Sequence, residues 1–172
     1  LFNMRFLILF IFLTTNVFAN DVSEIKNIVI HKDLKVYDNV IFLDKNDKKI
    51  NIKEFNGNLL LLNFWATWCE PCKEEMPSLD RLQINENFSN LKIFAINISQ
   101  ENKKKVDSFF KDLNIKNFDP YFDAPTTLAK TFSLRGVPTS ILINKDGKEF
   151  SRIMGSIDFD DKIFINWLKT YN

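Results

Sequence analysis

Cysteine and histidine are scarce in this chain. Its 172 residues contain two cysteines, Cys69 and Cys72, and one histidine, His31. A lone Cys-x-x-Cys pair cannot supply the four thiolates of a structural zinc site, and His31 lies far from the pair in sequence. We therefore expect no resident metal and no cofactor, and we assign His31 no catalytic role.

An excess of charge of one sign is also absent. The chain has 23 Lys and Arg residues against 22 Asp and Glu residues. Such a balance gives no basic field that would attract nucleic acid, so we expect no nucleic-acid partner. Internal repeats, low-complexity tracts and linkers are absent as well, and the length suits one domain with a short appendage.

The N-terminal segment has the pattern of an export signal. Met4 and Arg5 give a short basic start, Phe6 to Leu13 are apolar, and Val17 to Ala19 precede a cleavage point. This pattern predicts a signal peptide or a membrane anchor over residues 1–19. Both alternatives place the domain outside the cytoplasm. We therefore expect a periplasmic protein that is soluble after cleavage or tethered to the inner membrane.

The rest of the chain predicts an α/β domain over residues 38–172, preceded by a loose, polar lead-in over residues 20–37. Seven mostly apolar residues, 59–65, are typical of a strand buried on both faces. Further strands are expected at 40–43 and 49–52, which would form a hairpin, and at 91–98, 139–143 and 149–153. Helices are expected after Cys69, around 106–113, from 123 to 132, and from 158 to 169 with an acidic first turn.

The two cysteines lie between the buried strand and the helix that follows it. A Cys-x-x-Cys pair at such a junction is typical of a redox site. Cys69 would face the N–H groups of the first helical turn, which favour the thiolate that attacks disulfides. Cys72 lies one turn further and would resolve the mixed disulfide. The alternative is a static disulfide, which would constrain very little chain because its ring spans four residues.

The order of these elements, together with three motifs, resembles the thioredoxin fold over residues 38–170. The motifs are the segment from Asn63 to Lys73, then Pro77, then Gly136 to Thr139. Within the fold, the chain resembles the exported TlpA/ResA/DsbE (CcmG) branch of thiol–disulfide oxidoreductases. The resemblance implies a three-layer α/β/α architecture with a mixed sheet, an N-terminal β-hairpin and an extra βα insert.

The resemblance also implies roles for residues around the dithiol. Glu75 matches a glutamate that affects proton chemistry in ResA-like proteins, although a solvated helix glutamate is the alternative. The Val137–Pro138 bond is expected to be cis and to lie against the dithiol, where an incoming client strand would dock. Trp68 is expected to offer an exposed apolar surface to a partner. Pro71 presets a helical φ between the cysteines and would belong to the same substrate-binding surface.

Two neighbouring residues complete the expected site. Asn63 stands where thioredoxin itself carries a buried acid, so proton transfer from the resolving cysteine would pass to Glu75 or to water. Trp65 is expected to be half-buried beneath the site.

The function implied by the resemblance is reduction of disulfides in exported client proteins, such as apocytochrome c or copper-site assembly proteins. A membrane electron donor of the DsbD/CcdA type would keep the dithiol reduced. A Sco-like copper chaperone shares the fold but would use Cys-x-x-x-Cys and a later histidine, and a peroxidase would need Pro-x-x-x-Thr-x-x-Cys. Neither pattern occurs here. A non-catalytic interaction module on the same fold stays open as an alternative.

Overall fold

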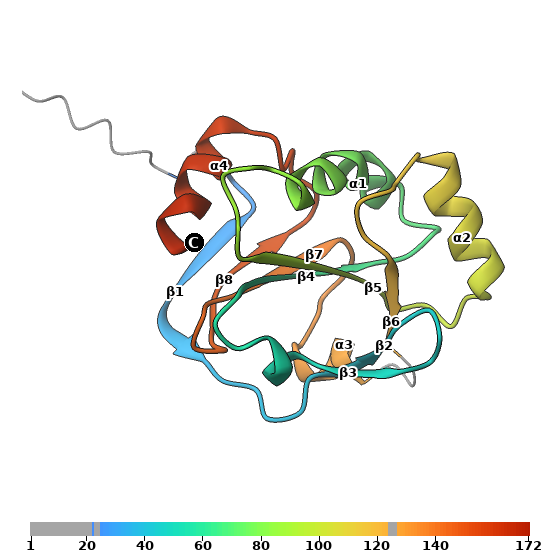
Figure 1. Ribbon diagram of the computed structural model, residues 1–172, viewed down its shortest axis with the longest axis horizontal. Helices are drawn as coiled ribbons and strands as arrows, with labels where there is room; N and C mark the ends of the chain where they lie inside the picture. Colours follow the sequence, from blue (N-terminus) through green and yellow to red (C-terminus); the bar gives the residue numbers. More distant parts are fainter. Residues whose placement is uncertain (1–21, 23–24, 124–126) are drawn as a thin grey trace, which may run out of the picture.

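A computed structural model describes residue 22, residues 25–123 and residues 127–172 of the chain. A central sheet separates two layers (Figure 1). Helices α1 (Glu70–Gln83), α2 (Lys103–Asp112) and α4 (Lys162–Leu168) lie on one side of it, and α3 (Leu128–Thr131) lies on the other. The predicted segment 1–19, with its signal or anchor, lies outside the described residues. None of the helices in the described part is long and apolar enough to span a membrane.

In the part of the chain that the structure describes, the sheet has eight strands. They are β1 (Ile28–Lys35), β2 (Ile41–Leu43), β3 (Lys49–Asn51), β4 (Leu59–Trp65), β5 (Leu91–Asn97), β6 (Pro120–Phe122), β7 (Thr139–Ile143) and β8 (Glu149–Met154). Their order across the sheet is β1-β8-β7-β4-β5-β6-β2-β3. Strands β4, β5 and β6 run parallel, and all other neighbours pair antiparallel, so the predicted mixed sheet is confirmed.

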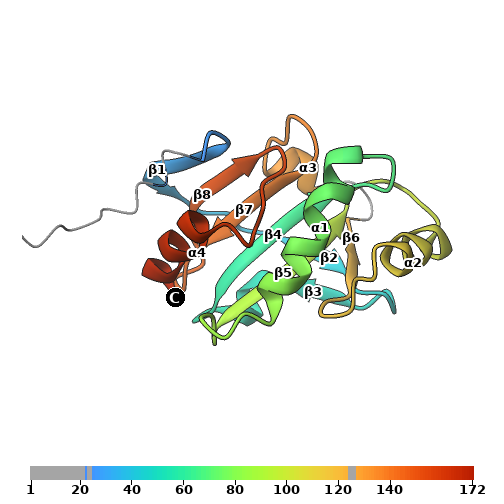
Figure 2. The same cartoon turned by 90° about the horizontal axis from the view of Figure 1, so that it is seen from above.

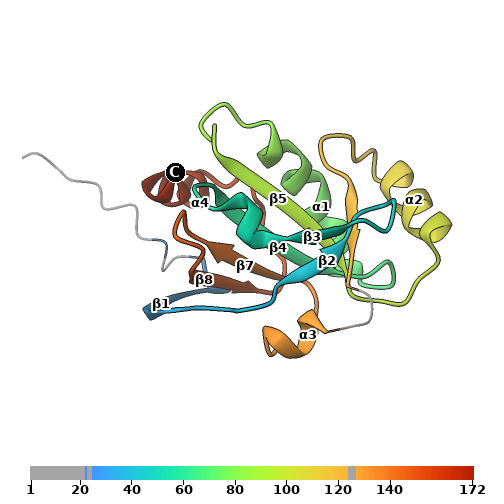
Figure 3. The same cartoon turned by 60° about the horizontal axis from the view of Figure 1, so that its bottom comes forward.

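Strand β4 is buried along its whole length, as its apolar run predicts. Its side chains alternate between two hydrophobic cores. Leu61 and Trp65 pack with α1, α2 and α4, whereas Leu62 and Phe64 pack with α3 and the segment around β2 and β3. Figure 2 shows α1 lying across β4 and β5, and Figure 3 shows the β2–β3 hairpin and α3 on the opposite face. The dithiol strand is therefore held from both sides.

The predicted hairpins and the βα insert are confirmed. Strands β2 and β3 pair around a short turn, and β7 and β8 pair around the Asp146-Gly147 turn, where Gly147 takes a φ of 76°. Between α1 and Pro138 the chain forms β5, α2, β6 and α3, which includes one βα unit more than a minimal thioredoxin. Pro77 lies inside α1, as expected.

The expectation of a loose lead-in is wrong for residues 28–35. This segment forms β1, an edge strand that pairs with β8. Its partner strand provides Glu149, which is fully buried and accepts a hydrogen bond of 2.6 Å from His31 when Nε2 carries the proton. Arg152 donates to the same carboxylate over 2.8 and 3.0 Å. The lead-in looked loose because its partners lie more than 100 residues away in the sequence.

Two helix starts also differ from the prediction. Helix α4 begins at Lys162 with Asp161 as its N-cap, so the acidic residues precede the first turn rather than forming it. Helix α3 begins at Leu128, and the Asp123 carboxylate accepts hydrogen bonds from the first backbone N–H groups of that region, including those of Thr127 and Leu128. Residues 124–126, where this helix was expected to start, lie outside the described residues.

Candidate active site

The candidate site begins where β4 ends. Cys69 is the N-cap of α1, and its Sγ accepts a hydrogen bond of 3.2 Å from the backbone N–H of Cys72. The two cysteines form a disulfide with a Cα–Cα distance of 5.3 Å. Cys72 is fully buried and Cys69 is 4% exposed, so the outer sulfur is the one at the helix start. First-turn N–H groups and the helix dipole favour a thiolate at this position after reduction.

The side chains between and beside the cysteines face solvent. Trp68 is 66% exposed, as predicted, and its indole Nε1 donates to Ser99 Oγ over 3.1 Å. Pro71 is exposed in the first turn of α1. Glu70 forms an exposed ion pair of 2.8 Å with Lys73, an arrangement worth little in stability. The dithiol is thus framed by an exposed aromatic ring and a proline.

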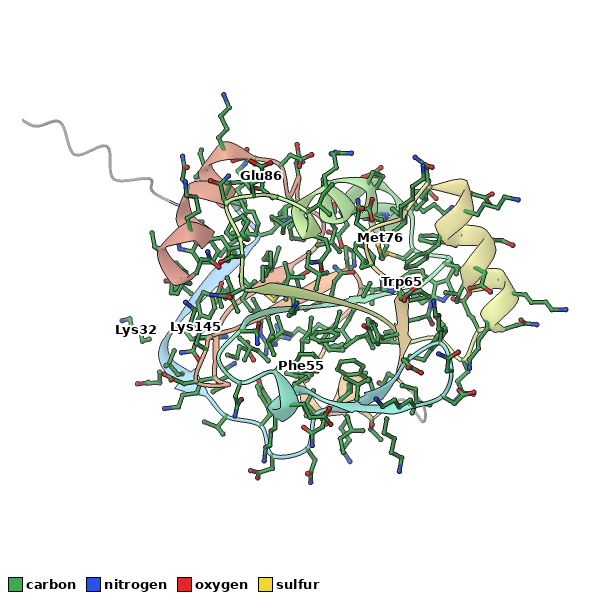
Figure 4. All side chains as sticks on the ribbon, viewed as in Figure 1. Lys32, Phe55, Trp65, Met76, Glu86 and Lys145 are labelled. Carbon is green, nitrogen blue, oxygen red and sulfur yellow. A yellow bond between two sulfur atoms is a disulfide. The ribbon has the colours of Figure 1, made fainter. Side chains whose placement is uncertain are left out.

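Trp65 is not half-buried beneath the site, as was expected, but completely buried. Its indole ring stacks on Phe109 of α2, with centroids 4.7 Å apart, and also contacts Phe110. Figure 4 places Trp65 and Met76 between the sheet and α1, whereas Phe55 lies on the opposite side of the sheet. The extra helix α2 covers the ring, and the sequence motif around Trp65 gave no indication of that cover.

A carboxylate that sequence reasoning missed holds the loop before Cys69. Glu101 accepts hydrogen bonds from the Thr67 backbone N–H over 3.1 Å, from the Thr67 hydroxyl, and from Asn97 Nδ2 over 3.1 Å. Lys105 Nζ lies 2.6 Å from the same carboxylate. Burial alone would raise the pKa of Glu101, but the hydrogen bonds from Lys105, Thr67 and Asn97 outweigh it and lower the pKa to about 2. The only sequence signal was the i, i+4 spacing of Glu101 and Lys105.

Glu75 is buried on the side of α1 that faces β4, which rules out the alternative of a solvated helix glutamate. Its residue is 2% exposed, and Oε1 accepts a hydrogen bond of 2.7 Å from Asn63 Nδ2. The same Asn63 amide donates to Ser140 Oγ over 3.0 Å. Burial raises the pKa of Glu75 to about 8, against the opposing effects of the Asn63 amide and the Ile157 backbone N–H. Asn63 therefore occupies the position of thioredoxin's buried acid but hydrogen-bonds a carboxyl group supplied by the helix.

A groove of about 430 Å³ leads from solvent to this carboxyl group. It lies between α1 and the segment after β8, and its lining comprises Glu74, Glu75, Pro77, Ser78, Arg81, Ser156, Ile157 and Asp158. Glu75 Oε2 has no hydrogen-bond partner among the described protein atoms. A buried carboxyl group with a pKa in the neutral range, beside an open groove, can exchange protons with solvent.

The Val137–Pro138 peptide bond is cis, as predicted. Pro138 is buried and Val137 is half-buried in front of β7. Val137 packs against both hydrophobic cores, one of which contains Cys69 and Cys72. The structure therefore brings this loop to the dithiol end of the sheet, where the resemblance placed it. The described residues contain no group of three or more His, Cys, Asp or Glu side chains that could hold a metal ion.

Comparison with known proteins agrees with this geometry. A family model described as Redoxin matches residues 24–160. Thiol-disulfide oxidoreductase ResA of a Bacillus cereus strain is 37% identical over 117 residues, which cover 68% of this chain and 66% of the relative. ResA of Bacillus subtilis (strain 168) is 32% identical over 119 residues, covering 69% and 65%. The matched part thus spans just under two thirds of these relatives' length.

Solved structures show the same fold. StoA from Bacillus subtilis superposes with a TM-score of 0.63 at 25% identity, covering 79% of this chain and 97% of that one. A thiol:disulfide interchange protein of the thioredoxin family from Chlorobium tepidum TLS gives a TM-score of 0.66 at 22% identity, covering 81% and 98%. The predicted thioredoxin fold and the resemblance to ResA are both confirmed. With its Cys-x-x-Cys pair at the start of α1 and a family match over most of its length, the chain belongs to the Redoxin family.

Proposed function

We propose that this protein is a thiol–disulfide oxidoreductase that reduces disulfides in client proteins through Cys69 and Cys72. The observation that carries the proposal is the disulfide between the N-cap of α1 and a fully buried cysteine one turn later. The names of the ResA relatives support the proposal: a protein named thiol-disulfide oxidoreductase ResA is 37% identical to this chain over 117 residues.

The reaction starts from the reduced dithiol. The Cys69 thiolate attacks one sulfur of a client disulfide, forms a mixed disulfide and releases the other client sulfur as a thiolate, which takes up a proton. Cys72 then loses its proton and attacks the Cys69 sulfur. This step forms the Cys69–Cys72 disulfide and releases the second client sulfur as a thiol. Two electrons pass from the dithiol to the client, and the oxidised form is the one observed here.

Glu75 is the group we assign to the proton of Cys72. It follows Cys72 by three residues, so both side chains lie on one face of α1. A pKa of about 8 lies close to that of a thiol, and proton transfer is efficient between groups of matched pKa. The groove beside Glu75 would then return the proton to solvent. Asn63 holds the carboxyl group in place through its 2.7 Å hydrogen bond.

Client binding is assigned to the surface around Cys69. Trp68 and Pro71 present exposed apolar surface beside the outer sulfur. On the other side, the loop of Val137 and Pro138 offers a backbone edge to which an extended client segment can add. The clients we propose are disulfide-bearing exported proteins, either apocytochrome c or proteins of copper-site assembly. A membrane electron donor of the DsbD/CcdA type would return the Cys69–Cys72 disulfide to the reduced dithiol after each reaction.

The proposal also places the domain outside the cytoplasmic membrane, soluble in the periplasm or tethered to the inner membrane. The pattern from Met4 to Ala19 supports this location. Reporter domains fused after residue 40 test it: we expect activity from a reporter that works only after export. Activity confined to a cytoplasmic reporter would contradict the proposed location but would leave the proposed oxidoreductase activity unaffected.

An insulin reduction assay tests the activity itself. The wild-type protein, supplied with dithiothreitol, should accelerate insulin precipitation, and Cys69→Ser and Cys72→Ser should both reduce the rate to the uncatalysed background. Glu86→Gln, an exposed change in the turn after α1, is the control and should keep the wild-type rate. A wild-type rate no higher than background would favour a copper-binding chaperone or an interaction module on this fold.

A further inference from the structure

An open groove of about 700 Å³ lies beside the Val137–Pro138 loop and has a basic lining. We call it the basic groove. It crosses β8 and reaches the edge strand β1. Its cationic residues are Lys35, Arg135 and Arg152, and His31 also lines it. Val29 and Met154, both exposed, add apolar surface. None of the described residues that line the groove is acidic.

The positive charge of Arg152 is compensated by the buried carboxylate of Glu149. Its guanidinium makes two hydrogen bonds to Glu149, a fully buried carboxylate that also accepts from Tyr37. Burial raises the pKa of Glu149, but its hydrogen bonds, above all those from Arg152, hold it below its ordinary value, so the carboxylate stays ionised at neutral pH. The charges of Arg152 and Glu149 therefore cancel, and these hydrogen bonds fix the position of the guanidinium in the groove wall.

Lys35 and Arg135, unlike Arg152, have no carboxylate partner among the described residues. Both side chains are exposed, and neither forms an ion pair with another described residue. Asp33, the acid nearest to Lys35 in sequence, does not line the groove. The groove consequently carries two positive charges that no described carboxylate neutralises. In a protein whose overall charge is nearly balanced, such a local surplus attracts anionic groups.

The position of the groove connects it to the dithiol. Thr139 at the start of β7 pairs with Phe64 near the end of β4, so the Val137–Pro138 loop lies at the same end of the sheet as Cys69. Gly136, Val137 and Pro138 form one wall of the groove. A client segment with its cysteine on Cys69 and its backbone along Val137 would continue into the basic groove.

We propose that the basic groove binds the client segment flanking the reactive cysteine, and that it selects segments with an Asp or Glu side chain within a few residues of that cysteine. Arg135 and Lys35 would contact the carboxylate, and Val29 and Met154 would contact neighbouring apolar side chains. This inference rests on the proposed function and adds a substrate class to it.

The test compares two disulfide-linked peptides that differ only in having Asp or Lys at the third residue after the cysteine. At low ionic strength, we expect the reduced wild-type protein to reduce the Asp peptide about ten-fold faster than the Lys peptide. Added salt should diminish this preference, because exposed charges are screened within about 10 Å at 0.1 M. Arg135→Glu should abolish or invert it. Lys92→Glu, the same charge change on β5 at the opposite end of the sheet, should retain it.

The outcomes distinguish failure of the proposed oxidoreductase activity from failure of the basic groove as a client-binding site. If the wild-type protein reduces neither peptide, the proposed oxidoreductase activity itself fails. If it reduces both peptides at equal rates, or prefers the Lys peptide, the activity stands and the basic groove is not an acidic-client site. The same conclusion follows if Arg135→Glu and Lys92→Glu change the preference equally, because the effect is then one of net charge.

Discussion

At the scale of single residues, Glu75 gives the site a group that titrates near neutral pH. Burial raises its pKa to about 8, and its neighbour Asn63 cannot take up a proton in its place. In the unfolded chain the same carboxyl group would titrate near 4.5. Between these two values the folded protein binds a proton that the unfolded chain does not bind, so folding stability must fall as pH rises through this range.

We therefore predict that the free energy of unfolding of the oxidised protein declines from pH 5 to pH 8 and that Glu75→Gln removes most of this decline. Glutamine keeps the shape of the protonated acid and does not titrate. Urea denaturation at several pH values measures the effect, with Glu74→Gln as the exposed control on the same helix. Parallel pH profiles for wild type and Glu75→Gln would show that Glu75 is not protonated in the folded protein at these pH values.

The two tryptophans beside the dithiol should respond oppositely to truncation. Trp65→Ala should cost about 3–5 kcal/mol of stability, because it opens a cavity beside Phe109 and Phe110. Trp68→Ala should change stability by no more than about 0.5 kcal/mol, because the side chain is mostly exposed, yet it should slow client reduction. Thermal unfolding and peptide-reduction rates measure the two effects. Unchanged client reduction by Trp68→Ala would remove Trp68 from the client surface.

The sequence indicated some of these residues and not others for physical reasons. The position of Cys69 at a helix start follows from local pattern, and so does the exposure of Trp68. Whether Glu74 or Glu75 is buried depends on which face of α1 packs against the sheet. The three-residue spacing from Cys72 favoured Glu75 but was not sufficient to decide it. The burial of Trp65 depends on α2, which begins almost 40 residues later.

At the scale of elements, Glu101 ties the loop before the dithiol to the loop before α2. Its carboxylate is 9% exposed and receives hydrogen bonds from Thr67, Asn97 and Lys105. Trp68 adds a second connection to the same loop through Ser99. These contacts hold the chain just before Cys69 in place. They come from the loop before α2, which lies outside the Cys-x-x-Cys motif.

We predict that Glu101→Gln destabilises the protein by about 1.5–3 kcal/mol at neutral pH, because charge-assisted hydrogen bonds are lost from a largely buried position. Since the folded pKa is lowered to about 2 from 4.5, this contribution is complete above pH 4.5 and disappears as pH falls through 2. Chemical denaturation at pH 7 measures it. The exposed Glu86→Gln serves as the control, and an equal, small loss in both variants would show that the Glu101 hydrogen bonds contribute little.

Strand β1 depends on a second long-range contact, the carboxylate of Glu149 with His31 and Arg152. Glu149→Gln should cost about 3–5 kcal/mol, because it leaves the partly buried Arg152 cation without its counter-charge. Asp33→Asn, an exposed change on β1, should have little effect. Hydrogen exchange of the β1 amides would show whether the loss releases this strand. Wild-type stability in Glu149→Gln would mean that backbone pairing alone holds β1.

The elements that the sequence predicted well are those whose partners lie nearby. The β7–β8 hairpin follows from Asp146-Gly147, and α1 follows from the motif that starts it. Strand β1 was mistaken for a loose lead-in because its polar, mixed composition gives no alternating pattern. Its fold depends on β8, which no local signal could indicate.

At the scale of the whole molecule, the residues of the candidate active site lie at one end of the sheet. The carboxyl ends of β4 and β5 lead to the dithiol and to the Glu101 loop, and β7 begins at the same end with the Val137–Pro138 loop. The groove beside Glu75 is lined by α1 and the segment after β8, and the basic groove is lined in part by the Val137–Pro138 loop. In the proposed reaction, a client disulfide would meet the nucleophile, the proton acceptor and the docking surface at this end of the sheet.

Mixed-disulfide trapping tests the central claim, that Cys69 attacks the client and Cys72 resolves the intermediate, most directly. Reduced Cys72→Ser and Cys69→Ser proteins are mixed with a disulfide peptide, and the adducts are located by mass spectrometry. We predict that Cys72→Ser accumulates a peptide on Cys69 that is released only by added thiol, that Cys69→Ser accumulates far less, and that wild type passes to the internal disulfide. Faster trapping on Cys72 in Cys69→Ser, or no adduct in either variant, would contradict the assignment.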